Sequence, residues 1–309
     1  MEIIADSLDF QLNREMAIAI GKFDGVHVGH RRLLEEILEK KREGLAACVF
    51  TFDVSPSVLF GLSDGKVLMT REEKRRIFRE LGVDVLVEFP MNRDTAAIPA
   101  EDFARRYLCA ALNGKFIAAG EDLSFGQYGK GDAALLRRLS AELDFEVKTI
   151  EKVRIDDIPV SSTYIRRLVE EGKMEEVQRF LGESYQVDGI VVHGRHLGHT
   201  LGFPTVNVVP PEEKLLPPFG VYASKVRVDE KLYRGVTNVG KKPTVNGAEN
   251  PAGIETFLYD FDGDLYGREV QVYLHHFCRP ERKFATVEEL KTQISRDVEE
   301  CAPEKWETL

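Results

Sequence analysis

The spacing of apolar residues changes near residue 183, and this change divides the chain into two kinds of fold. Before it, short apolar runs alternate with amphipathic helical patterns. After it, apolar residues recur at every second position between turn residues, with no convincing helix until residue 287. The 309 residues are enough for two domains of ordinary size. We therefore predict two domains, 1–183 and 184–309.

The first domain is predicted to be α/β. Its alternating order favours a doubly wound parallel sheet with helices on both faces. Ligands of such sheets bind beyond the carboxyl ends of the strands. A capping box of Thr70 and Glu73 marks one helix start. The expected strands are 17–20, 45–52, 83–89, 116–119 and 145–150, and the expected helices are 31–41, one from Thr70, 100–112, 132–143, 163–170 and 174–181.

The second domain is predicted to be mainly β. Between residues 187 and 277 it has period-2 stretches such as 222–228 and 269–273, which are typical of an antiparallel β-barrel or sandwich. A terminal helix is expected over 287–300, capped by Thr286 with Glu289.

Composition excludes several classes of protein. The net charge of −10 argues against a broad nucleic-acid or anionic-membrane surface. No apolar run approaches the length that spans a membrane, and the first ten residues have no signal-peptide pattern. The four cysteines form no CxxC pair, so they are interpreted as reduced thiols of a cytoplasmic protein.

The most informative local motif is GKFDGVHVGH, Gly21 to His30. It lies between an apolar strand pattern and a helical pattern, so His27 and His30 are placed at a helix N-terminus. Unpaired N–H groups and the positive end of the helix dipole suit phosphate there, and two imidazoles add hydrogen-bond donors. The alternatives are a capping histidine or a zinc site. Zinc would need further ligands, and no cysteine lies in the segment.

Three other segments of the first half could join this motif. Residues 120–126 (GEDLSFG) follow the fourth strand, and residues 161–166 (SSTYIR) begin a helix with hydroxyls and Arg166. The latter could bind an anion or simply cap its helix. Residues 51–56 (TFDVSP) end the second strand and give the weakest signal.

The second half carries a different set of candidates. Thr205 and Asn207 are two residues apart on an extended chain and point to one side. Their oxygens suit Mg²⁺ bridged to nucleotide phosphates. Upstream, residues 193–199 (HGRHLGH) read as a glycine loop over phosphates rather than a three-histidine metal site. Glu255 is the one carboxylate in a strongly apolar strand, and could be a cross-strand partner or, if it pointed into the barrel, a general base with a raised pKa.

Taken in order, these segments closely resemble the bacterial bifunctional riboflavin kinase/FAD synthetase family. The resemblance covers nearly the whole chain. GKFDGVHVGH, GEDLSFG and SSTYIRR match the family's adenylyltransferase module. Its riboflavin kinase module is matched by LGFPTVN, by residues 219–223, 238–240 with Pro243 and Thr244, 260–267, and 279–284.

The resemblance implies two reactions that use ATP and Mg²⁺. Riboflavin is phosphorylated to FMN, and FMN then attacks a second ATP to give FAD and pyrophosphate. By the same resemblance His27, His30 and Glu255 are catalytic, and Thr205 and Asn207 hold the metal. It assigns ATP or phosphate binding to Gly21, Phe23, Asp24, Gly29, Ser161, Ser162, Arg166, Gly194 and Gly198, and flavin binding to Asp122, Phe125 and Arg279.

The chain departs from the family pattern at three places. Val54 and Ser55 replace Pro-His in the loop after the second strand, Val206 replaces an alanine, and His199 replaces a basic residue. If His199 contacts phosphate, kinase activity would fall as pH rises through its pKa. The alternatives to a bifunctional enzyme are the same fold with only its kinase activity, and a flavin-binding carrier that does not catalyse.

Overall fold

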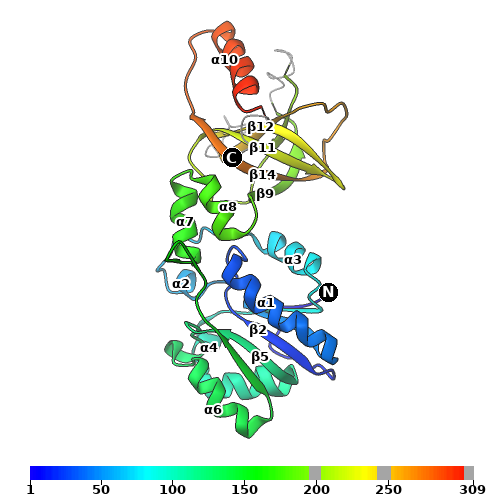
Figure 1. The fold of residues 1–309 in the computed structure, drawn as a ribbon, viewed down its shortest axis with the longest axis vertical. Coiled ribbons are helices and arrows are strands. Elements are labelled where there is room, and N and C mark those ends of the chain that lie inside the picture. Colours follow the sequence, from blue (N-terminus) through cyan, green and yellow to red (C-terminus); the bar gives the residue numbers. More distant parts are fainter. Residues whose placement is uncertain (195–202, 242–251, 303–309) are drawn as a thin grey trace. The chain divides into compact units, whose positions relative to one another are not determined.

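The structure is a computed structural model that describes residues 1–194, 203–241 and 252–302 (Figure 1). Its contacts divide the chain into two compact units, Met1–Ser162 and Thr163–Leu309. This division falls earlier than the predicted boundary at 183/184. The helices α7 (Ser162–Glu170) and α8 (Met174–Leu181) account for the difference, since α8 packs on two strands of the barrel.

The first unit is built on a six-stranded parallel sheet of order β1-β4-β3-β2-β5-β6. The chain winds outward from β2 in both directions, so the doubly wound prediction is confirmed. The strands are β1 (Glu2–Ala5), β2 (Met16–Ile20), β3 (Ala46–Phe52), β4 (Val85–Phe89), β5 (Gly114–Gly120) and β6 (Glu146–Ile150).

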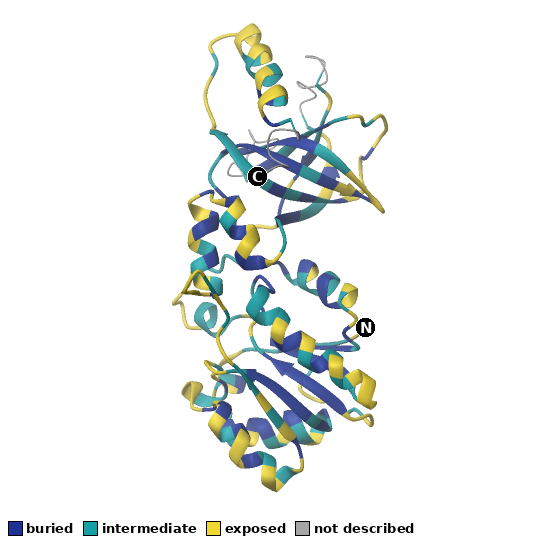
Figure 2. Ribbon diagram, viewed as in Figure 1, coloured by how far each residue is buried: buried dark blue, intermediate teal, exposed yellow. Residues whose placement is uncertain are grey.

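Helices cover both faces of this sheet (Figures 1 and 2). Strand β2 is MAIAI and wholly buried, as expected for a strand packed on both sides. Its even residues join one core with the π-helical segment η2 and α6, and its odd residues join another with α1 and α3. The longer segments are α1 (Val28–Lys40), α3 (Arg71–Glu80), η2 (Ala104–Ala111) and α6 (Ala133–Leu143).

Short elements complete the first unit, and sequence periodicity missed most of them. Strand β1 pairs with β4. The expected helix over 100–112 is split into α5 (Ala100–Phe103) and η2. The remaining short segments are α2 (Pro56–Leu59), α4 (Arg93–Ala96), η1 (Lys41–Glu43), η3 (Gln127–Gly129) and the hairpin β7 (Arg154–Ile155) with β8 (Ile158–Pro159).

The second unit contains a closed antiparallel barrel of order β10-β13-β12-β11-β14-β9, which confirms the predicted barrel. A terminal helix α10 (Val287–Glu300) follows it, and Thr286 caps that helix as predicted. The strands are β9 (Tyr185–Val192), β10 (Thr205–Val208), β11 (Gly220–Val228), β12 (Lys231–Lys241), β13 (Ala252–Leu258) and β14 (Glu269–Pro280).

The prediction of four reduced cysteines is wrong for one pair. Cys278 on β14 and Cys301 at the end of α10 form a disulfide, whereas Cys48 and Cys109 are free. The two bonded cysteines are 23 residues apart in sequence, and only the folded chain brings them together. The disulfide ties the end of α10 to the barrel.

Candidate active sites in the two units

The decapeptide GKFDGVHVGH forms a tight turn from β2 into α1 at the carboxyl edge of the sheet. Phe23, Gly25 and Val26 all have positive φ angles (51°, 90° and 41°), which is uncommon for residues with side chains. The buried Phe23 ring packs edge-on against Phe78 of α3, with ring centres 5.6 Å apart. The turn lies where the winding direction of the sheet reverses, between β2 and β5, which is where ligands of such sheets bind.

The two histidines are held as a stacked pair. His27 is the N-cap of α1, and its Nδ1 accepts the backbone N–H of His30 at 3.2 Å. The rings lie 3.6 Å apart and within 11° of parallel. Gly29 makes this possible, because a Cβ there would lie 3.2 Å from the His27 ring. The capping alternative and the phosphate-site prediction are therefore compatible, since capping uses only one nitrogen of His27.

Burial keeps both histidines uncharged at neutral pH. Desolvation lowers the pKa of His27 to about 4 and places the pKa of His30 well below its usual 6.5. The nearby positive charge of Lys74 lowers the pKa of His30 further. Nδ1 of His30 is buried and accepts or donates no hydrogen bond within the described residues. The pair can thus offer neutral hydrogen-bonding groups to a ligand rather than positive charge.

Asp24 anchors the turn to its surroundings. Its Oδ1 accepts the backbone N–H groups of Leu68 and Met69, at 2.8 and 3.3 Å, just before α3. Its backbone carbonyl accepts the Ser162 hydroxyl at 2.7 Å. The predicted phosphate residues Asp24 and Ser162 are therefore brought together, and Asp24 acts here as a structural link.

The other predicted residues of this half do not all lie beside the histidine pair. Asp122 follows β5, pairs with Lys152 at 2.8 Å, and acts electrostatically on His27. Phe125 is 3% exposed and packs on Phe103 in the core, so it presents no ring face to a flavin in this conformation. Ser161 precedes α7, and Arg166 lies one turn into α7 in the second unit.

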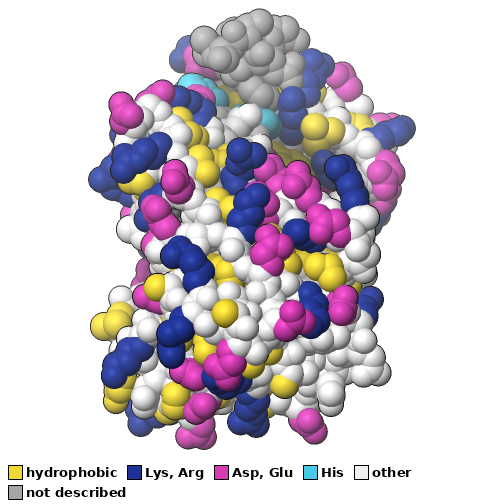
Figure 3. All heavy atoms as spheres, turned by 60° about the horizontal axis from the view of Figure 1, so that its bottom comes forward, with side chains coloured by type: hydrophobic (Ala, Val, Ile, Leu, Met, Phe, Trp, Pro, Cys, Tyr) yellow, Lys and Arg dark blue, Asp and Glu magenta, His cyan; other side chains and the backbone are white. Residues whose placement is uncertain are grey.

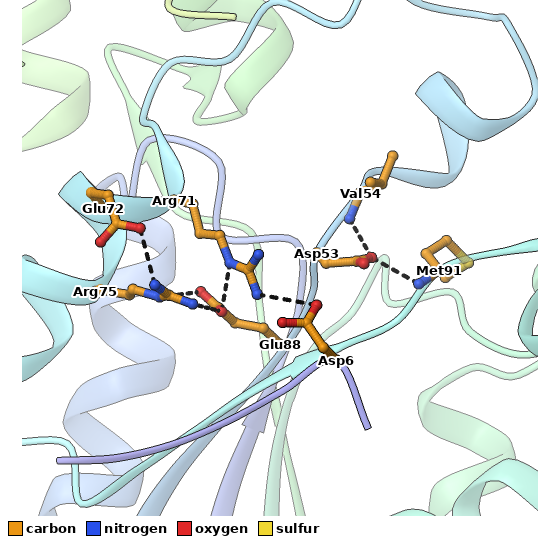
Figure 4. A network of polar contacts seen from close by, with 8 residues as sticks. All are labelled: Asp6, Asp53, Val54, Arg71, Glu72, Arg75, Glu88 and Met91. Atoms are coloured by element: carbon orange, nitrogen blue, oxygen red, sulfur yellow. Dashed lines mark hydrogen bonds and ion pairs between the residues drawn. The ribbon is translucent and has the colours of Figure 1, made fainter. Parts of the chain in front are cut away.

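An ionic network around the buried Glu88, which the sequence did not reveal, occupies the same edge at β1, β3 and β4 (Figure 4). Glu88 of β4 is 2% exposed and accepts from Arg71 at 2.7 Å and from Arg75 at 2.5 and 3.0 Å. Asp53, in the loop where the family pattern is altered, accepts the backbone N–H groups of Val54 and Met91. Asp53 therefore shapes the Val54–Ser55 loop directly.

The barrel carries the second group of predicted residues on its outer face. Thr205 Oγ1 donates to Glu255 Oε1 at 2.5 Å. Asn207 and Asn238 are the register partners of Glu255 on the two neighbouring strands. Along β13, Ile254, Thr256 and Leu258 are buried while Glu255 alternates with them, so Glu255 faces away from the barrel core. It does not point into the barrel interior.

Two cavities meet at this face. The first, of about 270 Å³, lies between the barrel and α10, and is lined mainly by apolar side chains such as Phe257, Phe284 and Ile294, with Glu255 among them. The second, of about 280 Å³, is more polar and is lined by Asn207 and the 258–266 turn. Thr205 lines both cavities.

Gly194 and His193, in the loop after β9, lie against two residues that line the polar cavity, Asn207 and Tyr266. A Cβ on Gly194 would lie 2.5 Å from the Asn207 amide, so glycine lets the loop pass directly over Asn207. His193 stacks on Tyr266 with ring centres 3.8 Å apart. Gly198 and His199, together with Leu201, Gly202, Pro243 and Thr244, lie outside the described residues.

Arg279 lines the apolar cavity, but its guanidinium is engaged. It donates to Asp297 of α10 at 2.7 and 2.5 Å, and Asp297 is 5% exposed. Arg279 therefore holds α10 against the barrel as a wall of the cavity. Sequence reasoning missed Asp297, because nothing in the local pattern marks a helix carboxylate as a partner for a distant strand.

The donor set at Thr205 and Asn207 is that of a hard cation that also binds phosphate. Within the described residues no group of three His, Cys, Asp or Glu side chains could hold a metal ion. A hydroxyl and an amide carbonyl beside a polar cavity, which Asp262 and Asp264 also line, fit Mg²⁺ that completes its shell with phosphate oxygens and water. They do not fit zinc.

The fold and these sites define an ATP-using transferase with an α/β nucleotidyltransferase unit and a kinase barrel. The FAD synthetase family model matches residues 9–164, and the riboflavin kinase family model matches residues 181–303. The chain belongs to the family of bifunctional riboflavin kinase/FMN adenylyltransferases. Relatives of that description from Escherichia coli K12 and Bacillus subtilis are 38% and 37% identical, covering 91% and 92% of this chain and 90% of each relative.

A solved structure of similar fold, described as a macrolide-efflux protein from Streptococcus pneumoniae, has a TM-score of 0.84 and 31% identity. It covers 96% of this chain and 97% of its own. The description as an efflux protein applies to the Streptococcus pneumoniae protein. In the described part of this chain, no helix is both long and apolar enough to cross a membrane.

The chain thus has two enzyme activities: it phosphorylates riboflavin to FMN and adenylylates FMN to FAD, with ATP as co-substrate. Substrates of both steps carry phosphate, yet the chain is acidic. On the face drawn in Figure 3, basic and acidic side chains are interspersed rather than gathered by sign. Positive charge for phosphate must therefore come from particular residues at each site.

Proposed function

We propose that the GKFDGVHVGH turn is the adenylyltransferase site and that the Thr205–Glu255 face of the barrel is the kinase site. The observation that carries the kinase assignment is the position of Thr205. It lines both cavities and donates to Glu255, so the residues that would meet the flavin and the nucleotide are in direct contact.

In the kinase step, riboflavin occupies the apolar cavity and ATP the polar one. Glu255 accepts the proton of the flavin 5′-hydroxyl, and Thr205 holds the carboxylate in position. Phosphoryl transfer requires mainly positioning and neutralisation of charge, so one base at the junction of the cavities is sufficient.

Thr205 and Asn207 would hold Mg²⁺ in this step, and Gly194 is proposed to lie beside the phosphates. The metal supplies charge for the transferring phosphoryl group. The Val206 replacement leaves these two residues on a common side, because strand side chains alternate.

In the adenylylation step, the FMN phosphate attacks the α-phosphorus of ATP and pyrophosphate leaves. The N-terminus of α1 and the N–H groups of the neutral histidines stabilise charge on the phosphates. Ser161, Ser162 and Arg166 are proposed to hold the triphosphate, with Gly21, Phe23 and Gly29 shaping the turn. FMN is proposed to lie near Asp122 and the Val54–Ser55 loop. Both reactions use ATP. We also propose, as the sequence predicts, that the protein is located in the cytoplasm.

Two substitutions test this division of labour in the full-length protein. We expect the Glu255→Gln protein to form no FMN from riboflavin but still to convert supplied FMN to FAD. We expect His30→Ala to lower FAD formation by about 10²-fold or more while FMN still accumulates. Chromatography of the flavins measures both products.

The outcomes also separate the rival predictions. FMN without FAD from the unaltered protein would support a chain that keeps only the kinase activity, and unchanged riboflavin would support a carrier. If each substitution lowered both activities equally in a folded protein, the assignment of the two sites would be wrong.

A further inference from the structure

Apart from Arg166, the residues assigned so far to the adenylyltransferase site carry no positive charge. Its two histidines are neutral, whereas the triphosphate of ATP carries several negative charges. Nearby Lys152 is already paired with Asp122, and Arg71 and Arg75 are held by the buried Glu88. Neutral donors and a helix dipole compensate only part of that charge.

Lys74 of α3 is near enough to His30 to act on it electrostatically. The start of α3 is fixed to the decapeptide turn through Asp24, which accepts the N–H groups of Leu68 and Met69. One helical turn after Lys74, the Phe78 ring packs on Phe23, and the Phe23 ring lies 5.0 Å from that of His30. Since residues four apart share a helix face, Lys74 is on the side of α3 that faces the turn.

The ammonium group of Lys74 has no partner among the described residues, either in a hydrogen bond or in an ion pair. It is partly buried, and desolvation lowers its pKa although carboxylates lie nearby. Each of these carboxylates is committed elsewhere. Asp24 and Asp53 accept backbone N–H groups, and Glu88 binds two arginines (Figure 4).

An unpaired, desolvated ammonium costs stability, so a fold that retains one invites a functional explanation. We propose that Lys74 is a further binding and catalytic residue of the adenylyltransferase site, where it donates to the phosphates of ATP. The inference rests on the proposed placement of those phosphates at His27 and His30. The phosphates of bound ATP would then pair with the Lys74 ammonium group.

The test compares Lys74→Met and Lys74→Arg with a control that removes an equal charge, Arg79→Met, on the exposed part of the same helix. FMN is supplied directly, and kcat and KM for ATP are measured in FAD synthesis. Riboflavin phosphorylation by the same preparations serves as an internal control. Thermal unfolding of each full-length variant is recorded.

We expect Lys74→Met to lower kcat/KM for ATP in FAD synthesis by about 10- to 100-fold. Kinase activity should stay within about twofold, and the melting temperature should be equal or higher, because an unpaired buried charge is removed. Arg79→Met should match the unaltered protein, and Lys74→Arg should recover part of the activity.

Two results would overturn the inference. One is FAD synthesis by Lys74→Met that equals that of Arg79→Met. The other is a loss of FAD synthesis together with a lower melting temperature and no recovery in Lys74→Arg, which would make Lys74 structural. The His30→Ala variant separates the two proposals. If His30→Ala retains FAD synthesis, the adenylyltransferase site is wrongly placed. If His30→Ala loses FAD synthesis and Lys74→Met retains it, only the role of Lys74 is wrong.

Discussion

At the residue scale, His27 serves the fold as well as the chemistry. Its Nδ1 caps α1 and its ring stacks on His30, so a residue expected to meet phosphate is also part of the local structure. The same burial that fixes the ring lowers its pKa to about 4. A histidine placed in this way adds stability only while it is neutral.

This predicts a loss of stability in mild acid. The unfolded His27 titrates near 6.5 and the folded one near 4, so between these values the unfolded state binds more protons. The contribution is complete above pH 6.5 and declines by about 3 kcal/mol as pH falls to 4. Urea unfolding of the full-length protein between pH 7 and pH 4 measures it.

The matched variant is His27→Asn, which keeps a capping acceptor but does not titrate. Its stability should vary less with pH than that of the unaltered protein. Equal pH dependence in the two proteins would show that His27 is not the group responsible.

At the scale of elements, α10 forms part of the proposed kinase site although it contributes no proposed catalytic group. It walls the apolar cavity with Leu290 and Ile294. Two neighbouring links hold it to β14, the Arg279–Asp297 ion pair and the Cys278–Cys301 disulfide. We therefore expect Arg279 to affect flavin binding through the position of this helix.

Asp297→Asn tests this role of α10. Removing one charge of a buried pair leaves the other uncompensated, at a cost of about 3–5 kcal/mol. We expect KM for riboflavin to rise, while adenylylation of supplied FMN is unchanged because that site lies in the other unit. Steady-state kinetics of the two reactions in one preparation measure the effect. An unaltered KM for riboflavin in a folded variant would show that α10 does not depend on this pair.

At the scale of the whole molecule, the residues proposed for adenylylation belong to the first unit except Arg166, which follows the division at Ser162/Thr163. The proposed kinase residues Thr205, Asn207 and Glu255 all belong to the barrel. Nothing in this arrangement requires that both reactions occur on one molecule.

An equimolar mixture of the Glu255→Gln and His30→Ala proteins should therefore make FAD from riboflavin. The His30→Ala protein releases FMN, which the Glu255→Gln protein then uses as its substrate. FAD should therefore appear after a lag that shortens as protein concentration rises. Time courses of the three flavins provide the measurement. Failure of the mixture, with each variant still active in its own reaction, would indicate obligatory transfer of FMN within one molecule.

Local sequence patterns were sufficient for the class of each unit and for most element positions. Alternating apolar runs and helices favour a parallel sheet, and period-2 stretches between turn residues favour antiparallel strands. The patterns also placed His27 and His30 at a strand-to-helix turn, and Thr205 and Asn207 on one side of a strand. Each of these depends only on residues that are neighbours along the chain.

Only the tertiary structure decided what those side chains touch. Burial made the histidines neutral, Asp24 and Arg279 were engaged by distant partners, Phe125 went to the core, and Cys278 met Cys301. Among the residues that the structure describes, it also left Lys74, which acts electrostatically on His30, without a partner. Pairing and desolvation arise from segments far apart in the sequence, so periodicity and motif spacing do not contain them.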